Sequence, residues 1–203
     1  MQLIGMHDSP FVRRVAVTAR FLDIPLEYRQ ISIFRAYDEV RAINPMVKVP
    51  TLVCDDGQFL VDSTLIIDYL ESLAGGKRLM PSDETNYIRA LNAIGTSMVA
   101  MEKVVGLIYE TEQRPPEVQH RPWMERLQQQ LLGAIGLMED IVGDGSNWLF
   151  GDELTNADIS IAIAWRFIQL RMPDRVPAED YPGLVLFSER AEALPEFQAC
   201  PLD

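Results

Sequence analysis

The sequence contains little cysteine and no long apolar run. Cys54 and Cys200 are its two cysteines, and they form no Cys-x-x-Cys pair and no cluster with histidine. A disulfide framework and a zinc finger are therefore excluded, and a reducing, cytoplasmic location is expected. No uninterrupted apolar run approaches the roughly 18 residues of a membrane span, and Asp8 and Pro10 interrupt the stretch where a signal peptide would stand. We therefore expect neither a signal peptide nor a membrane partner.

Basic residues are scarce relative to acidic ones, with 18 Lys and Arg against 30 Asp and Glu and a formal net charge of -12. Residues 1–80 carry nine basic and ten acidic side chains, whereas residues 81–203 carry nine and twenty. A chain this acidic repels phosphate backbones, so nucleic acid is not an expected partner. We interpret the acidic second part as a solvated helical surface, whereas the nearly neutral first part can still hold a small anion.

The apolar pattern changes near residue 75, within a composition (48% hydrophobic, 24% charged) typical of folded proteins. Before that point, strand-like and helix-like runs follow one another in the order β-α-β-α-β-β-α. The expected strands are 2–6, 26–31, 51–54 and 58–61, the last two joined by an Asp-Gly turn, and the expected helices are 10–22, 37–43 and 63–73. After a linker at 77–83, helices are expected at 87–109, 123–142, 158–170 and 184–194, the third of them apolar nearly all round and therefore central. The sequence thus predicts an α/β domain over residues 1–76 and an all-helical domain over residues 84–203.

The densest chemical signal is Ser9-Pro10-Phe11-Val12-Arg13-Arg14-Val15, where the first strand gives way to the first helix. Serine at the N-cap followed by proline is good helix-start chemistry by itself. The same geometry presents the Ser9 hydroxyl beside free N–H groups at the positive end of a helix, a place that stabilises a thiolate. His7 and Asp8 precede Ser9 directly, but neighbours on a strand point to opposite faces, so a Ser-His-Asp triad is not expected.

Two further signals flank the predicted hairpin. Lys48-Val49-Pro50 precedes it, and a cis Pro50 would turn the N–H and C=O of Val49 outward to pair with an extended peptide. Asp62-Ser63 opens the helix after it. Plain helix capping is one interpretation of that pair; the other is that Ser63 and the helix N-terminus bind a carboxylate while Asp62 faces an ammonium group.

In this order and spacing, the three motifs resemble those of the glutathione S-transferase family. Residues 1–80 resemble its thioredoxin-like glutathione domain and residues 84–203 its all-helical domain. The Ser9 motif is similar to the serine-type motif of tau-like and many bacterial members. Asn44-Pro45 with Lys48-Val49-Pro50 resembles the family's loop with a cis-proline, and residues 151–158 resemble its capping box at the buried helix.

The resemblance implies a role for each matching residue. Ser9 would donate a hydrogen bond to the glutathione sulfur, with Phe11 packed beneath the thiol region. Val49, held by Pro50, would pair with the cysteinyl backbone, Asp62 and Ser63 would hold the γ-glutamyl end, and Lys48 would reach the glycyl carboxylate. Asp62 stands where most members carry Glu or Gln, so its shorter side chain implies a water-mediated grip. Thr155 and Asp158 are interpreted as a structural capping pair.

The expected activity is conjugation of glutathione to a small hydrophobic electrophile in detoxification, or reduction of a peroxide, with no metal. Two alternatives are a non-catalytic scaffold similar to stringent starvation protein A and a glutaredoxin-like thiol transferase, which would need a cysteine where Ser9 stands. Met98, Met101, Val105 and Trp165 are candidates for the acceptor pocket, although methionines at helical spacing more often belong to the core. The resemblance also implies a homodimer that pairs the first domain of each chain with the second of the other.

Overall fold

The computed structural model describes residues 1–202. Its contacts divide the chain into two compact units, one formed by residues 1–79 with residues 193–202 and the other by Met80–Glu192. The sequence analysis placed everything after residue 84 in the helical domain, and for residues 193–202 this assignment is wrong. These residues contain α8 (Pro195–Gln198), which packs on α1 (Pro10–Phe21). The apolar ring of Phe197 is fully buried there, in an edge-to-face contact with Phe21.

The first unit is built on a four-stranded sheet with the strand order β2-β1-β3-β4. Its strands are β1 (Gln2–Ile4), β2 (Glu27–Arg29), β3 (Thr51–Val53) and β4 (Phe59–Val61). Strand β1 pairs in parallel with β2 and antiparallel with β3, and its Leu3 lies opposite Tyr28 on one side and Leu52 on the other. Strands β3 and β4 form the predicted antiparallel hairpin. The predicted order of strands and helices is confirmed, with strands shorter than the alternating pattern suggested.

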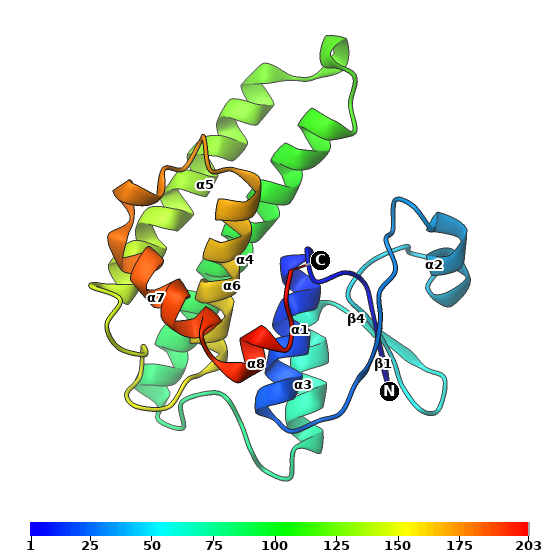
Figure 1. The fold of residues 1–203 in the computed structure, drawn as a ribbon, viewed down its shortest axis with the longest axis vertical. Helices are drawn as coiled ribbons and strands as arrows, with labels where there is room; N and C mark the ends of the chain where they lie inside the picture. The colour runs from blue at the N-terminus through cyan, green and yellow to red at the C-terminus, as the bar shows by residue number, and fades with distance from the viewer. Residues whose placement is uncertain (203) are drawn as a thin grey trace. The chain divides into compact units, whose positions relative to one another are not determined.

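Helices cover both faces of this sheet, because adjacent apolar residues of β1 point in opposite directions. On one face, Ile4 packs with Ile31 and with Val40 of α2 (Tyr37–Ile43). Helices α1 and α3 (Ser63–Leu73) lie side by side and apart from α2 (Figure 1). Since α1 contacts β1, α3 and α8, its residues from Val12 to Ala19 are all buried, including two arginines.

The second unit consists of α4 (Glu84–Glu112), α5 (Arg121–Val142), α6 (Asn156–Arg171) and α7 (Pro182–Glu192), with short 3₁₀ turns at Pro116–Val118 and Ala178–Asp180. Helix α6 packs against α4 and α7, and nearly all its residues up to Ile168 are buried, as its all-round apolar pattern predicted. The predicted capping box is present, since Asp158 Oδ2 accepts from the backbone N and Oγ1 of Thr155, at 2.8 and 2.6 Å.

Among residues 1–202, α4 is long and apolar enough to cross a membrane by length and composition. Its best 18-residue window has a mean hydropathy of 1.3, and 33% of that window is buried. Core helices of folded domains satisfy the same two criteria, and α4 packs against α5 and α6. The expectation of no membrane partner, which was based on uninterrupted apolar runs, stays a prediction.

Candidate functional site

The junction between β1 and α1 depends on Gly5. Its φ of +134° is a conformation that L side chains rarely adopt, and a Cβ there would lie 2.6 Å from Val12 Cγ2 and 3.1 Å from Val49 Cβ. Glycine therefore lets the loop that carries Val49 approach the backbone just before α1. Two of the three motifs singled out in the sequence, 48–50 and 9–15, meet at this point.

Ser9 is the N-cap of α1. Its backbone is extended, and its Oγ accepts a hydrogen bond from the Val12 N–H at 3.4 Å, with Pro10 in the first turn. A hydroxyl that accepts one bond still has its own proton to donate. The half-buried Ser9 thus caps the helix and also presents a donor at the positive end of the helix dipole, so the two interpretations of this residue are compatible.

His7 has contacts of its own. Its ring stacks on Tyr28 with centroids 4.0 Å apart, and its Nδ1 lies 3.1 Å from the carbonyl oxygen of Pro201. Because a carbonyl oxygen only accepts, Nδ1 carries the proton in this contact. A histidine that acts as a base for Ser9 would need a free ring nitrogen facing that hydroxyl. The observed stacking and the bond to Pro201 give no support to a triad.

A buried amide holds the loop before β3. Asn44 is fully buried, its Nδ2 donates to Thr51 Oγ1 at 2.9 Å, and its Oδ1 accepts from the Met46 N–H at 3.0 Å. Thr51 Oγ1 in turn donates to the carbonyl oxygen of Lys48 at 2.7 Å. The backbone of Lys48 is thus fixed while its side chain is exposed. The Val49–Pro50 bond that follows is cis, as the resemblance implies.

The start of α3 gathers several polar side chains. Asp62 adopts a left-handed φ of 72°, and its Oδ1 accepts from the N–H groups of Thr64 and Leu65, at 2.8 and 3.4 Å. Arg14 Nη1 donates to both Ser63 Oγ and Thr64 Oγ1, at 3.0 Å each. Ser63 is only 2% exposed, whereas Asp62 and Thr64 are exposed. Part of the carboxylate that was expected to face an ammonium group therefore serves as a helix cap.

Burial lowers the pKa of Arg14 to about 10, and the negative charge of Asp62 partly opposes this effect. The guanidinium therefore keeps its proton at neutral pH, although it is almost fully buried. The sequence analysis missed Arg14 and Thr64 as parts of this site. For Arg14, the available signal was a charged side chain within a largely apolar helix. For Thr64, it was a hydroxyl directly after Ser63 in the first turn of α3.

The four acceptor-pocket candidates lie in the second unit. Met101 is fully buried in α4, in line with the core interpretation of the methionines, and Met98 and Val105 on the same helix are half-buried. Trp165 of α6 is buried with its ring against Tyr181, at a centroid distance of 5.6 Å. Met101 and Trp165 therefore present little surface to a ligand.

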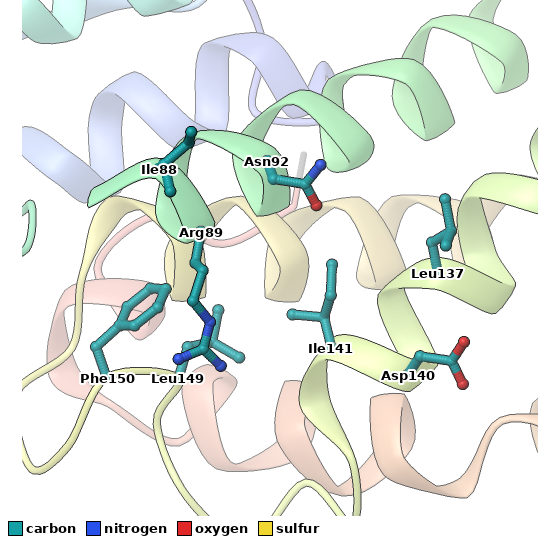
Figure 2. Close-up of a pocket in the computed structure, with 8 residues that line it drawn as sticks. All are labelled: Ile88, Arg89, Asn92, Leu137, Asp140, Ile141, Leu149 and Phe150. Carbon is teal, nitrogen blue, oxygen red and sulfur yellow. The ribbon is translucent and has the colours of Figure 1, made fainter. Parts of the chain in front are cut away.

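The sequence analysis also missed a cavity of about 470 Å³ between α4 and α5 in the second unit. Figure 2 shows Arg89 of α4 extending toward Phe150, and its Cζ lies 5.8 Å from the centre of that ring. Ile88 from α4 and Leu137 from α5 line the same cavity and are exposed. Within residues 1–202, no group of three or more His, Cys, Asp or Glu side chains is arranged to hold a metal ion.

Known proteins with similar sequences cover nearly the whole chain. "Uncharacterized GST-like protein YibF" of Escherichia coli (strain K12) is 28% identical over 192 residues, which cover 93% of this chain and 92% of that protein. The maleylacetoacetate isomerase of Pseudomonas aeruginosa is 26% identical over 208 residues, which cover 98% of this chain and 94% of the isomerase. Glutathione transferase GST 23 of Zea mays is 26% identical over 203 residues, covering 86% of this chain and 90% of that protein.

Solved structures are similar over the full chain. A glutathione S-transferase of Methylobacterium radiotolerans in complex with glutathione sulfonate has a TM-score of 0.91 at 25% identity, covering 100% of this chain and 95% of that one. A glutathione transferase family member from Pseudomonas fluorescens Pf-5 with bound glutathione has a TM-score of 0.85 at 26% identity, covering 100% and 98%. The family model of the glutathione S-transferase N-terminal domain matches residues 3–78, and that of the C-terminal domain matches residues 121–190. Because these two models together span more than half of the sequence and the fold agrees throughout, the chain belongs to the glutathione S-transferase family.

Proposed function

We propose that this protein is a glutathione transferase in which the Ser9 hydroxyl donates a hydrogen bond to the glutathione sulfur. The observation that carries the proposal is the position of Ser9 as N-cap of α1, with its Oγ accepting from the Val12 N–H and its own proton left to donate. Similar structures that hold glutathione or glutathione sulfonate support the choice of thiol. Phe11, half-buried in the first turn of the same helix, packs beneath the thiol region.

The chemical benefit follows from the pKa of the thiol. A free thiol has a pKa of about 8.5, so only a few per cent is thiolate at pH 7. A hydroxyl donor and a helix N-terminus stabilise the thiolate but not the thiol, and this difference lowers the pKa. The thiolate then attacks an electrophilic carbon and either displaces a leaving group or adds to an activated double bond.

The remaining contacts hold the peptide. Val49, which precedes the cis Pro50, pairs its backbone with the cysteinyl residue in the manner of an added strand. Asp62 and Ser63 receive the γ-glutamyl end at the start of α3, and exposed Lys48 reaches the glycyl carboxylate. The near-neutral charge of residues 1–80 favours an anionic peptide there more than the acidic remainder of the chain does.

The second substrate is proposed only as a class, a small hydrophobic electrophile. Relatives of nearly equal identity bear the names of an isomerase and a transferase, so the assays need to include both chemistries. The purified protein is first applied to immobilised glutathione. Retention and elution by free glutathione support the proposal, and failure to bind favours the scaffold alternative. Wild type and Ser9→Ala are then compared with an aryl halide, an epoxide, an organic hydroperoxide and a cis-enedione.

We propose further that the protein is a homodimer that works in the reducing cytoplasm, where Cys54 and Cys200 stay free thiols. The exposed apolar side chains of Ile88, Leu91 and Leu137 lie on α4 and α5 and suit a protein contact. Pairing the first unit of one chain with the acidic second unit of the other avoids placing two strongly acidic surfaces together. A two-fold arrangement also uses up the contact surface of both chains, so no further copies are added to the dimer.

A further inference from the structure

Residues 6–9 form a tight turn that ends at Ser9. The turn is closed by the N–H of Ser9, which donates to the carbonyl oxygen of Met6 at 3.1 Å. The bond that the Val12 N–H donates to the Ser9 hydroxyl is longer, at 3.4 Å, and therefore weak. The position of this hydroxyl thus depends on how firmly the turn itself is held.

His7 is the second residue of this turn, and its side chain is buried. Its ring stacks on Tyr28 of β2, with the centroids 4.0 Å apart and the ring planes 9° from parallel. Its Nδ1 donates to the carbonyl oxygen of Pro201 at 3.1 Å, across 194 positions of the sequence. One side chain therefore ties the turn both to the sheet and to a segment that follows the second unit in the sequence.

The segment at residues 197–201 is itself anchored on α1. Arg13, which is also buried, donates from Nε to the carbonyl oxygen of Cys200 at 2.8 Å, and its guanidinium lies over the ring of Phe197. Phe197 is fully buried, and its carbonyl oxygen accepts from the Cys200 N–H at 3.0 Å. Proline fixes its own φ and restricts the residue before it, so the Pro201 carbonyl has little freedom to turn. The acceptor of the histidine bond is thus held in place on α1.

Packing alone does not require a histidine at position 7. Phenylalanine would stack on Tyr28 equally well, but it has no donor for a carbonyl oxygen. Histidine supplies both contacts and so fixes the turn from two sides. Such support matters next to a reacting atom, because a donor displaced by about 1 Å loses much of its effect on the reaction.

We propose that His7 is a positioning residue for Ser9. Through its bond to Pro201 it fixes the turn at residues 6–9, so that the Ser9 hydroxyl points at the glutathione sulfur. The inference rests on the proposed function and adds to it a side chain that acts only through Ser9. It also gives residues 197–201, which lie far from the turn in the sequence, a part in holding the thiol site.

The test is a double-mutant cycle between His7→Phe and Ser9→Ala. It measures the pKa of bound glutathione by titrating the ultraviolet absorbance of the thiolate, so no electrophile is needed. His7→Phe should raise this pKa by about 0.5–1 unit, a three- to tenfold loss of thiolate at neutral pH. In the Ser9→Ala background the same replacement should shift it by less than about 0.3 unit, because the effects of residues that act through one another do not add. With an aryl halide, kcat should fall in parallel, while the KM for glutathione changes less than about twofold.

Two further variants separate the bond from packing and from stability. His7→Asn loses the ring but keeps a donor near the position of Nδ1, so it should raise the thiol pKa less than His7→Phe does. Gln169→Leu is the matched control, because it removes a side-chain donor from the carbonyl oxygen of Val176, at 3.0 Å, in the second unit. It should lose comparable stability and leave the thiol pKa unchanged. If His7→Phe fails to fold, Arg13→Met releases the neighbouring Cys200 carbonyl, and a rise that depends on Ser9 is again expected.

The failures of the two proposals are distinguishable. If Ser9→Ala leaves the pKa of bound glutathione unchanged, the proposed role of Ser9 is wrong, and the role of His7 falls with it. If Ser9→Ala raises the pKa and His7→Phe does not, only the inference about His7 is wrong. Equal shifts by His7→Phe in both backgrounds, or an equal shift in Gln169→Leu, also overturn it. A larger shift in His7→Asn than in His7→Phe would assign the effect to stacking and refute the role of the bond to Pro201.

Discussion

Replacing Ser9 by alanine separates the two tasks that the structure gives this hydroxyl. The first is the helix cap, a single bond from the Val12 N–H to Oγ at 3.4 Å. Loss of an N-cap side chain costs about 0.5–2 kcal/mol, and a bond this long belongs at the lower end of that range. The variant is therefore expected to fold, with its free energy of unfolding reduced by about 0.5–1 kcal/mol.

The second task is the proposed hydrogen bond to the thiolate. A bond to a charged group contributes about 1.5–3 kcal/mol, and each pKa unit corresponds to about 1.4 kcal/mol. The pKa of the bound glutathione thiol should thus rise by roughly one to two units in Ser9→Ala. Turnover at pH 7 should fall about ten- to a hundredfold, while glutathione affinity changes little because the other contacts are remote from sulfur.

The assay is the pH profile of kcat/KM for conjugation, together with the ultraviolet absorbance of the thiolate in the binary complex. Above the raised pKa both forms hold their glutathione as thiolate, so the ratio of wild-type to variant rates should shrink as the pH rises. Asp83→Ala is the control, because it removes a comparable helix cap, the acceptor of the Asn86 N–H at 2.9 Å, from α4 in the second unit. It should keep the wild-type profile.

Three outcomes would refute the role of Ser9. Full activity of Ser9→Ala with several electrophiles excludes the hydroxyl as a donor. A rate loss that is constant across the pH range excludes an effect on the thiol pKa. An equal loss in Asp83→Ala would mean that the activity follows helix stability.

Three further predictions concern stability and assembly. Asn44→Ala should lower the free energy of unfolding by about 2–3 kcal/mol, measured by urea denaturation, because it removes buried hydrogen bonds that hold the loop before β3. Because that loop carries Val49, the same variant should raise the KM for glutathione. Asp158→Asn should cost about 1–3 kcal/mol in the same assay, because an amide group places a donor against one of the donors that now bind the carboxylate. Light scattering should give about twice 23.0 kDa, and Ile88→Glu, which charges an apolar side chain that is 66% exposed on α4, should shift the mass toward the monomer. A wild-type mass near 23.0 kDa would exclude the dimer.

Local signals were sufficient for many of the elements. Helices 37–43 and 63–73 were predicted with their observed bounds. Each is followed by residues that end a helix locally, Asn44-Pro45 after the first and Gly75-Gly76 after the second. The first strand was predicted too long, as residues 2–6, because its largely apolar run continues past Gly5 to Met6. The positive φ of Gly5, which L side chains rarely adopt, ends the strand at Ile4, and the missing Cβ leaves room for Val49.

The sequence by itself determined the order of strands and helices, the capping box of α6 and the three motifs, because each depends on residues only a few positions apart. Tertiary structure alone decided which distant groups meet. Arg14 reaches Ser63, 49 positions away, and Arg13 binds the backbone of Cys200, 187 positions away. Local periodicity marks both arginines only as polar residues in an apolar helix. Their burial arises because α3 and α8 close over α1, and these packing contacts depend on the whole first unit rather than on any one segment.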